Sequence, residues 1–483
     1  MERKLKSLKI NFLYNLSLKI LNIIFPLITF PYVARVLTAE GIGKVDFSLS
    51  VIQYFILLSQ FGIPTYAIRE CAKHRHDKDK LAKTVQEILT LNFIMIFLVY
   101  ILFFIIVNSV EELFIYKNLL IIMSLSIITT NMGIEWFYQA IEDYRYITIV
   151  NFIVKLVTLI AVFMFVKNES DYFTYGLITV LSLSIGYLFN FVYVNKHIQL
   201  FKKYSGYKFK RHIKPIIILF AMTFSISVYI NLDKVMLGFI SGDTSVGLYS
   251  SVNKVIMVII ALITSLGAVL LPRMSYYIGS NSREEINLLI RKSIDFIFMI
   301  SIPATIGILI LSKPIIILFA GNDYSEAVST LRILSPIIIA IGLSNLIGIQ
   351  VLVSHGKEKL TVISTVIGAI MNFSLNIVLI PVYQQNGAAI STLIAEITVT
   401  VVQIVLAFSY LKGNIMYKNI LSYIFGSCII ILICLSVSYL EYNEIITIVI
   451  SVLFSSVGYF GILYILKNEL VRNVISNVIK KTT

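Results

Sequence analysis

Charged side chains stand inside the long apolar segments of this chain, where lipid alone cannot accommodate them. We single out four cations and three acids for their depth in those segments: Lys19, Arg35, Lys234, Lys254, Asp46, Asp233 and Glu396. Each such charge costs on the order of 3 kcal/mol at the middle of a bilayer, and charges retained at that depth usually face a polar cavity. These residues are therefore the first candidates for chemistry.

The cations predict a site for an anion. Phosphate and diphosphate groups bind ammonium and guanidinium groups and other N–H donors, and these contacts are strong in a site of low dielectric constant. We assign Lys19, Arg35, Lys234 and Lys254 to substrate binding, with the amide of Asn231 beside them.

The acids predict coupling of transport to an ion gradient. A carboxylate at this depth can exchange a proton or coordinate a sodium ion. Asp233 is the first candidate, together with Asp46 and Glu396. No catalytic residue, resident metal or cofactor is predicted. His74 and His76 lie in a basic loop without the further ligands that a metal site needs.

Two predicted helices carry several of these residues on polar stripes. One stripe is formed by Asn11, Asn15, Lys19, Asn22, Pro26 and Thr29, and the other by Thr223, Ser227, Asn231, Lys234 and Gly238. Spacings of three and four residues place such side chains on one helix face. Helix–helix packing is the alternative interpretation, because Asn, Ser, Thr and Gly commonly join membrane helices. The lysines favour a cavity.

Other intramembrane charges have simpler explanations. Asp295, Arg332 and Glu135 lie near the ends of predicted spans, where we expect them to snorkel or to cap helices. Lys155 is expected to pair within its own helix bundle.

Membrane-spanning helices must position all of these residues. The 483 residues are 58% hydrophobic and only 14% charged, with a mean hydropathy of +0.88, whereas soluble proteins carry about 25% charged residues. Repeated apolar runs of about 20 residues predict an all-α polytopic membrane protein. Fourteen spans are predicted, at 10–37, 45–68, 86–108, 116–140, 147–167, 173–195, 215–240, 247–271, 292–312, 326–354, 361–381, 387–410, 420–440 and 445–466.

The distribution of the 40 lysines and arginines predicts the orientation. Most of them fall in loops on the side that holds both termini, whereas the opposite loops contain only Lys44, Lys117, Lys167 and Lys313. Positive residues mark the cytoplasmic side, so both termini are predicted to be cytoplasmic. This topology also explains the net charge of +14 without nucleic acid as a partner.

The chain repeats across the basic loop 196–214. Gly43 and Gly247 are each predicted in the turn between the first two spans of a half, and Arg69 and Arg273 each follow the second span; both pairs are 204 residues apart. Such parallel repeats are typical of transporters whose site lies between the halves. We predict six-helix bundles over 1–205 and 206–411, and two additional helices with a cytoplasmic tail over 412–483.

The chain resembles the polysaccharide-biosynthesis flippases, the Wzx-type oligosaccharide-lipid translocases of the multidrug/oligosaccharidyl-lipid/polysaccharide exporter superfamily. Three stretches carry the resemblance: PLITFPYVARVLTAEGIGKVDFSLSVIQYFILLSQFGIPTYAIRECAK near the start, NLDKVMLGFISGDTSVGLYSSVNKV (231–255) and PVYQQNGAAISTLIAE (381–396). The first of them is the most specific.

This resemblance implies a flippase that moves an undecaprenyl-diphosphate-linked oligosaccharide, such as an O-antigen or capsule unit, from the inner to the outer leaflet of a bacterial plasma membrane. It implies two six-helix bundles that face a central cationic cavity and rock between inward-open and outward-open states. The polymerase and ligase of the same glycan pathway are implied partners.

Three alternatives remain open. A lipid II flippase or a multidrug cation antiporter of the same superfamily would share the fold, although an antiporter for cations should have a cavity dominated by acids. A membrane glycan polymerase or glycosyltransferase belongs to a different class and needs catalytic groups on a sizeable external loop. The predicted outer loops are short, which argues against such an enzyme.

Overall fold

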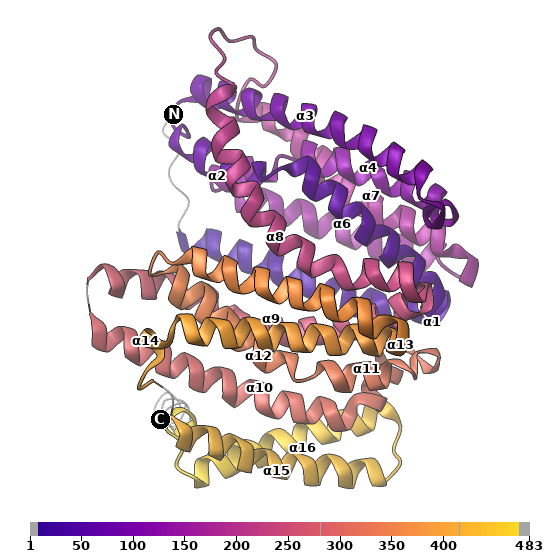
Figure 1. The fold of residues 1–483 in the computed structure, drawn as a ribbon, viewed down its shortest axis with the longest axis vertical. Coiled ribbons are helices and arrows are strands. Elements are labelled where there is room, and N and C mark those ends of the chain that lie inside the picture. Colours follow the sequence, from indigo (N-terminus) through magenta and orange to yellow (C-terminus); the bar gives the residue numbers. More distant parts are fainter. Residues whose placement is uncertain (1–7, 281, 415, 473–483) are drawn as a thin grey trace. The chain divides into compact units, whose positions relative to one another are not determined.

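A computed structural model describes residues 8–280, 282–414 and 416–472 of the chain (Figure 1). Helices form its regular structure, and no strand occurs within those ranges. A helix satisfies its own backbone hydrogen bonds, which is what an apolar segment in lipid requires. The chain divides into two compact units, Met1–Gly247 and Leu248–Thr483, and each is described by itself. The predicted boundaries after residues 205 and 411 stay predictions.

The helices of the first unit are drawn in indigo to magenta in Figure 1. They are α1 (Leu8–Gln60), α2 (Ile63–Lys73), α3 (Lys78–Ser109), α4 (Lys117–Met132), α5 (Glu135–Ala140), α6 (Tyr144–Phe165), α7 (Tyr172–Tyr193) and α8 (Lys210–Ser241). Short 3-10 helical turns connect some of them, at Glu111–Tyr116, Glu169–Asp171 and Val194–Lys196.

The second unit contains most of α9 (Asp243–Gly279), followed by helices drawn in pink to yellow. They are α10 (Arg283–Ala320), α11 (Ala327–Leu334), α12 (Ile337–Asn345), α13 (Glu358–Leu406), α14 (Phe408–Leu411), α15 (Tyr417–Tyr439) and α16 (Glu444–Ile465). A 3-10 turn at Asn322–Tyr324 and a π-helical segment at Leu346–Val353 complete the unit.

Within the described ranges, eleven helical segments are long and apolar enough to cross a membrane. Two of them each combine two predicted spans: Leu16–Lys73 and Glu358–Leu406. The first turns at Thr38 and the second at Gln384, where the backbone angles are not helical. The predicted all-helical, multi-pass fold is confirmed, while the number of fourteen spans stays a prediction.

The turn between the first two predicted spans lies at Thr38 and not at Gly43. Thr38 has φ 59° and ψ 179°, and Gly43 already belongs to the following helical segment. The second half has nearly the same conformation at Gly242, with φ 82° and ψ −179°, and Gly247 follows inside α9. Thr38 and Gly242 are also 204 residues apart. The predicted spacing of 204 residues therefore holds for the two turns. Each turn lies five residues before the glycine at which it was predicted.

Helix α8 packs along the second part of α1 in the opposite direction. A Cβ atom on Gly238 would overlap the ring of Phe47, and near the other end of the contact Gly62 lies against the backbone of Phe220. Small residues permit such close approach between membrane helices. This packing turns part of the polar stripe of α8 toward α1.

The two helices that we predicted as additions, α15 and α16, pack on α10 of the second unit (Figure 1). The Tyr459 hydroxyl of α16 donates to the Met299 carbonyl of α10 at 2.9 Å. Asn419 Nδ2 of α15 donates to Asp295 Oδ2 at 2.9 Å. Asp295 is only 3% exposed, so the expectation that it snorkels toward water is wrong: it lies buried against a neighbouring amide.

Candidate functional site

The structure distributes the predicted substrate-binding residues over several helices. Arg35 on α1 is exposed and donates from Nη1 to the Pro31 carbonyl at 2.6 Å. Three others are half-buried: Asn231 and Lys234 on α8, and Lys254 on α9 in the second unit. The side chain of Lys19 lies outside the described residues. Their convergence on one cavity stays a prediction.

The predicted ion-coupling acids lie on three different helices. Asp233 on α8 is 5% exposed and lies close enough to Tyr54 of α1 for its charge to act on the phenol. Asp46 on α1 is half-buried and acts in the same way on Tyr175 of α7. Glu396 is half-buried on α13 in the second unit. The coupling role of these acids stays a prediction.

Lys155 of α6 pairs within its own unit, as the sequence predicts. Its Nζ donates to Asn22 Oδ1 of α1 at 2.6 Å and lies 5.0 Å from the centre of the Phe25 ring. The aromatic face and the amide oxygen both stabilise the ammonium group where water is scarce. Asn22, part of the predicted polar stripe of α1, therefore serves helix–helix packing.

A buried network of amides joins α1, α3 and α4. Asn92 Nδ2 donates to the Ser59 carbonyl at 3.0 Å and to Asn131 Oδ1 at 2.9 Å. Asn131 Nδ2 donates to Ser59 Oγ at 2.7 Å. Ser59 lies one residue before α1 ends, so these bonds hold the chain where the helix stops. All three residues are at most 4% exposed.

Beside this network lies a polar cavity of about 130 Å³. Its lining residues come from six helices of the first unit: Gln60, Ile63, Pro64, Ile68, Asn92, Thr130, Asn131, Glu135, Trp136, Gln139 and Tyr187. Glu135 is the acidic member. Glu135 lies at the start of α5, so the expectation of a helix-end position is met, and its side chain also lines this cavity. Sequence reasoning missed this site, because its lining comes from residues between Gln60 and Tyr187 that no local pattern brings together.

A second buried polar cluster ties the start of α8 to α3. His212 is fully buried; its Nε2 lies 2.8 Å from Glu87 Oε2, and its Nδ1 lies 2.6 Å from the Tyr66 hydroxyl. Arg211 Nη2 donates to Glu87 Oε2 at 2.7 Å, and the Lys208 N–H donates to Glu87 Oε1 at 2.6 Å. Because Glu87 is also fully buried, these contacts compensate for its lost hydration.

In the second unit, buried polar residues join α9 to α13. Asn376 Nδ2 donates to Asn372 Oδ1 at 3.1 Å, and Asn372 Nδ2 lies 3.4 Å from Thr392 Oγ1. The Tyr249 hydroxyl lies 3.0 Å from the same Thr392 oxygen. These contacts are those of packing between helices.

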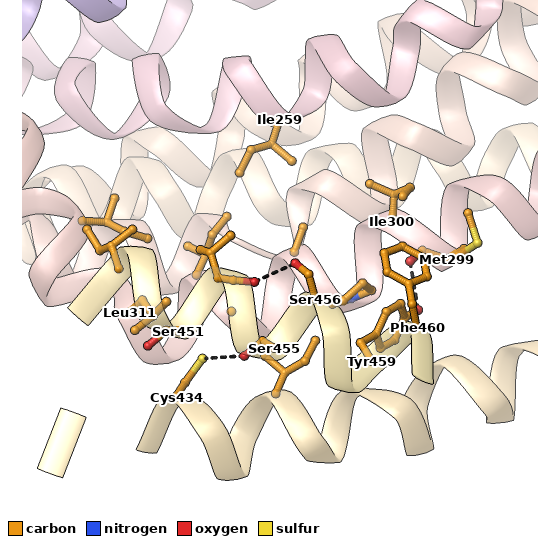
Figure 2. Close-up of a pocket in the computed structure, with 18 residues that line it drawn as sticks. Ile259, Met299, Ile300, Leu311, Cys434, Ser451, Ser455, Ser456, Tyr459 and Phe460 are labelled. Atoms are coloured by element: carbon orange, nitrogen blue, oxygen red, sulfur yellow. Dashed lines mark hydrogen bonds between the residues drawn. The ribbon is translucent and has the colours of Figure 1, made fainter. Parts of the chain in front are cut away.

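An apolar pocket of about 360 Å³ lies between α10, α15 and α16, with Ile259 of α9 at its edge (Figure 2). Two of its polar groups bond within the protein: Ser456 Oγ donates to the Val452 carbonyl at 2.7 Å, and Cys434 Sγ lies 3.6 Å from Ser455 Oγ. The pocket therefore presents mainly hydrocarbon, which suits an alkyl chain.

Long helices that break within the span, together with buried polar and charged groups between them, define a multi-pass membrane transporter. The chain belongs to the family described as Polysaccharide biosynthesis protein, whose model matches residues 8–278, more than half of the sequence. A second family model, MatE, matches residues 215–378. The resemblance inferred from the three sequence stretches is thereby confirmed.

Curated relatives cover most of the chain. A protein of Escherichia coli (strain K12) named "Putative O-antigen transporter" is 26% identical over 397 residues, which are 82% of this chain and 95% of the relative. The "Lipid II flippase MurJ" of Bacillus subtilis (strain 168) is 30% identical over 183 residues, 37% of this chain and 32% of the relative. These relatives are transporters and flippases, and the present chain is a transporter too, not an enzyme.

Solved structures share the fold. A lipid II flippase MurJ in an inward closed conformation matches with a TM-score of 0.78 and 18% identity, over 96% of this chain and all of that one. An inward-facing multidrug resistance MATE family transporter of the MOP superfamily matches with a TM-score of 0.64 and 14% identity, over 84% of this chain and 95% of that one. At these identities the likeness concerns the fold alone.

Proposed function

We propose that this protein is a flippase for lipid-linked glycans. Its substrate is an undecaprenyl-diphosphate-linked oligosaccharide, an O-antigen, capsule or related unit, which moves from the inner to the outer leaflet. Transport proceeds by alternating access and is coupled to an ion gradient.

The observation that carries this proposal is the relative from Escherichia coli named as an O-antigen transporter, which aligns with 82% of the chain and over 95% of its own length. An alignment of that extent includes both units, so the likeness concerns the whole transporter and not a shared fragment. A protein of Haloferax volcanii named as a probable flippase of low-salt glycan biosynthesis aligns over 39% of the chain.

The chemistry of the chain fits an amphipathic substrate. The apolar pocket between α10, α15 and α16 suits the hydrocarbon of a polyprenyl lipid, and burial of such a chain is favourable in proportion to its area. Lys19, Arg35, Asn231, Lys234 and Lys254 are the proposed contacts for the diphosphate and sugar. Asp233, Asp46 and Glu396 are the proposed ion-coupling acids.

The proposed location is the plasma membrane of a bacterium, with both chain termini in the cytoplasm. The polymerase and ligase of the glycan pathway are the proposed protein partners, because they act on the lipid-linked unit after it reaches the outer leaflet. No cofactor is assigned.

Deletion of the gene tests the proposal. A lipid-linked oligosaccharide should accumulate on the inner leaflet, and the surface glycan should be lost; a plasmid copy of the gene should restore both. If the lipid-linked oligosaccharide does not accumulate and the surface glycan is unchanged, the proposal is wrong.

A lipid II flippase is the second candidate. The sequence match to the Bacillus subtilis MurJ supports it, at 30% identity over 183 residues. Accumulation of lipid II in the same deletion strain, with an intact surface glycan, would favour this candidate.

A further inference from the structure

Two helices of the first unit break at the same place. The chain leaves α1 through Phe61, with φ 45°, and Gly62, with φ 75°. It leaves α4 through Ile134, with φ 36°. Positive φ is rare for a residue with a side chain, and most of all for a β-branched one such as isoleucine. Strained backbone of this kind clusters at functional sites and is held there by its surroundings.

The polar cavity described above lies where these breaks meet. Gln60 precedes the break in α1, and Ile63 and Pro64 follow it. Thr130 and Asn131 precede the break in α4 and Glu135 follows it directly. The packing around the second break is tight, since a Cβ atom on Gly133 would overlap the Tyr187 ring.

Glu135 is half-buried, and it is the one charged residue in the described lining of this cavity. Its charge acts on Tyr187 of α7 and on Tyr144 at the start of α6. Gln139, one turn further along α5, interacts with it as well. The other lining residues from α1, α2, α3 and α4 carry no ionisable side chain, and the described lining includes no lysine, arginine or histidine.

This environment destabilises the charged form of Glu135 relative to its protonated, neutral form. A half-buried carboxylate without a cation must be stabilised by water or amides, whereas a protonated carboxyl group needs only hydrogen bonds. The cavity has room for a few water molecules. Water can deliver a proton to a Glu135 oxygen and take it back, so that one O–H bond forms and later breaks without any other reactant.

We propose that this cavity is a proton-binding site, at which Glu135 takes up and releases a proton during each transport cycle. The inference rests on the proposed flippase function for its role in transport, but the binding of the proton does not. A charged Glu135 keeps the cavity hydrated, while a neutral one allows it to close. The proton thereby favours one arrangement of the two helix breaks over the other. An ion that binds one of two conformations more tightly can drive a conformational cycle in this way.

The protein carries its own probe of this site. Trp136 follows Glu135 directly, lines the same cavity, and is the only tryptophan in the sequence. Tryptophan emission of the purified full-length protein, excited selectively at the red edge of the absorption band, should change with pH as Glu135 titrates. In Glu135→Gln this transition should disappear.

Two variants control the titration. Glu40→Gln removes a glutamate of the same unit that is exposed and paired with Lys44, and should leave the transition unchanged. Gln139→Met keeps the carboxyl group and removes a neighbouring amide, so it should keep the transition and shift its midpoint; this variant also tests the site if Glu135→Gln does not fold. A transition that persists unchanged in Glu135→Gln, or that follows sodium concentration at constant pH in place of pH, overturns the proposal.

Proteoliposomes test the link to transport, with lipid-linked oligosaccharide extracted from the deletion strain as substrate. An imposed pH gradient should accelerate translocation severalfold for the wild type and for Glu40→Gln, but not for Glu135→Gln. An equal acceleration in Glu135→Gln overturns the coupling role. If the wild type does not translocate this lipid at all, the proposed function is wrong, and the tryptophan titration still decides whether the site binds a proton.

Discussion

Gly43 lies against the backbone of Asp243, so closely that a Cβ atom at position 43 would overlap the Asp243 carbonyl. The reciprocal contact also exists: a Cβ atom on Gly247 would overlap the Ala39 carbonyl. Asp243 follows Ala39 by 204 residues, and Gly247 follows Gly43 by the same number. The two contacts are therefore equivalent under the internal repeat. In each of them, a glycine of one repeat lies against a backbone carbonyl of the other repeat.

Alanine at either glycine should destabilise the protein. Gly43→Ala and Gly247→Ala each place a methyl group into a backbone that cannot move aside as a flexible side chain can. Overpacking of this kind costs about 1–3 kcal/mol. The melting temperature of the detergent-solubilised protein measures the loss.

Gly307 of α10 supplies the control for this pair. It is helical, and a Cβ atom there would meet no atom within 4 Å. Gly307→Ala should leave the melting temperature unchanged or raise it, since alanine is the better helix former by about 0.5–1 kcal/mol. Equal melting temperatures for all three variants would contradict the close contacts.

Glycine should be the best residue at position 38. The φ and ψ of Thr38 fall in a region that only glycine adopts readily, and such strain costs of order 1–3 kcal/mol. Its Oγ1 donates to the Leu37 carbonyl at 2.6 Å. Thr38→Gly and Thr38→Ala both lose that bond, but only the glycine variant relieves the strain. Thr38→Gly should melt at a higher temperature than Thr38→Ala; the reverse order would count against the turn.

Asn22 and Lys155 should show strong non-additivity. Asn22→Leu leaves the Lys155 ammonium group without its amide partner and should cost about 2 kcal/mol. Lys155→Met removes a half-buried charge together with its desolvation cost and should be close to neutral. The double variant should regain most of the stability that Asn22→Leu loses. Thermal melting of all four proteins completes the cycle, and additive effects would mean that the two residues do not interact.

Removal of the Glu87 carboxylate should be among the most damaging changes in the first unit. Glu87→Ala leaves His212 and Arg211 without their shared acceptor, and breaking a buried pair typically costs about 3–5 kcal/mol. Asp79→Asn, which changes an exposed pair with Lys202, is the matched control and should have no measurable effect. A mild phenotype for Glu87→Ala would show that the cluster is not needed to hold α8 against α3.

Asp233→Asn should abolish or weaken the response of transport to an ion gradient. The asparagine keeps the shape of a side chain that is 5% exposed but cannot take up a proton or neutralise a cation. Proteoliposomes with imposed proton or sodium gradients provide the measurement. Normal transport by Asp233→Asn, with and without a gradient, would remove Asp233 from the coupling residues.

The sequence predicts the class of fold well because the signal is local. Each apolar run is long enough to require a helix, and the pairing of Lys155 inside its own unit follows from the cost of an isolated charge. The 204-residue register also holds, although the turn lies at Thr38 and not at the more conspicuous Gly43. Threonine is not a residue type that marks a turn with positive φ, so the position of the turn could not be predicted from the sequence.

The cavity at Glu135 could not be predicted either, because the backbone breaks that form it leave no signal in the residue types. It exists because the helix breaks at Phe61 and Ile134 meet, and neither an aromatic nor a β-branched residue signals a break. Its walls come from segments far apart in sequence, from Gln60 to Tyr187. Only the packing of the unit turns Glu135 from a residue at a span end into part of an internal site.

The loop before α8 has a practical consequence for dissecting this transporter. Leu200 and Lys202 offer their carbonyls to Gln86 of α3, while the Ser205 and Gly206 carbonyls accept from Lys83. A chain severed between positions 203 and 204 would thus leave both new ends fastened to the same helix. We therefore expect two co-expressed polypeptides, 1–203 and 204–483, to reassemble at this loop, so that each piece can carry its own isotope or fluorescent label.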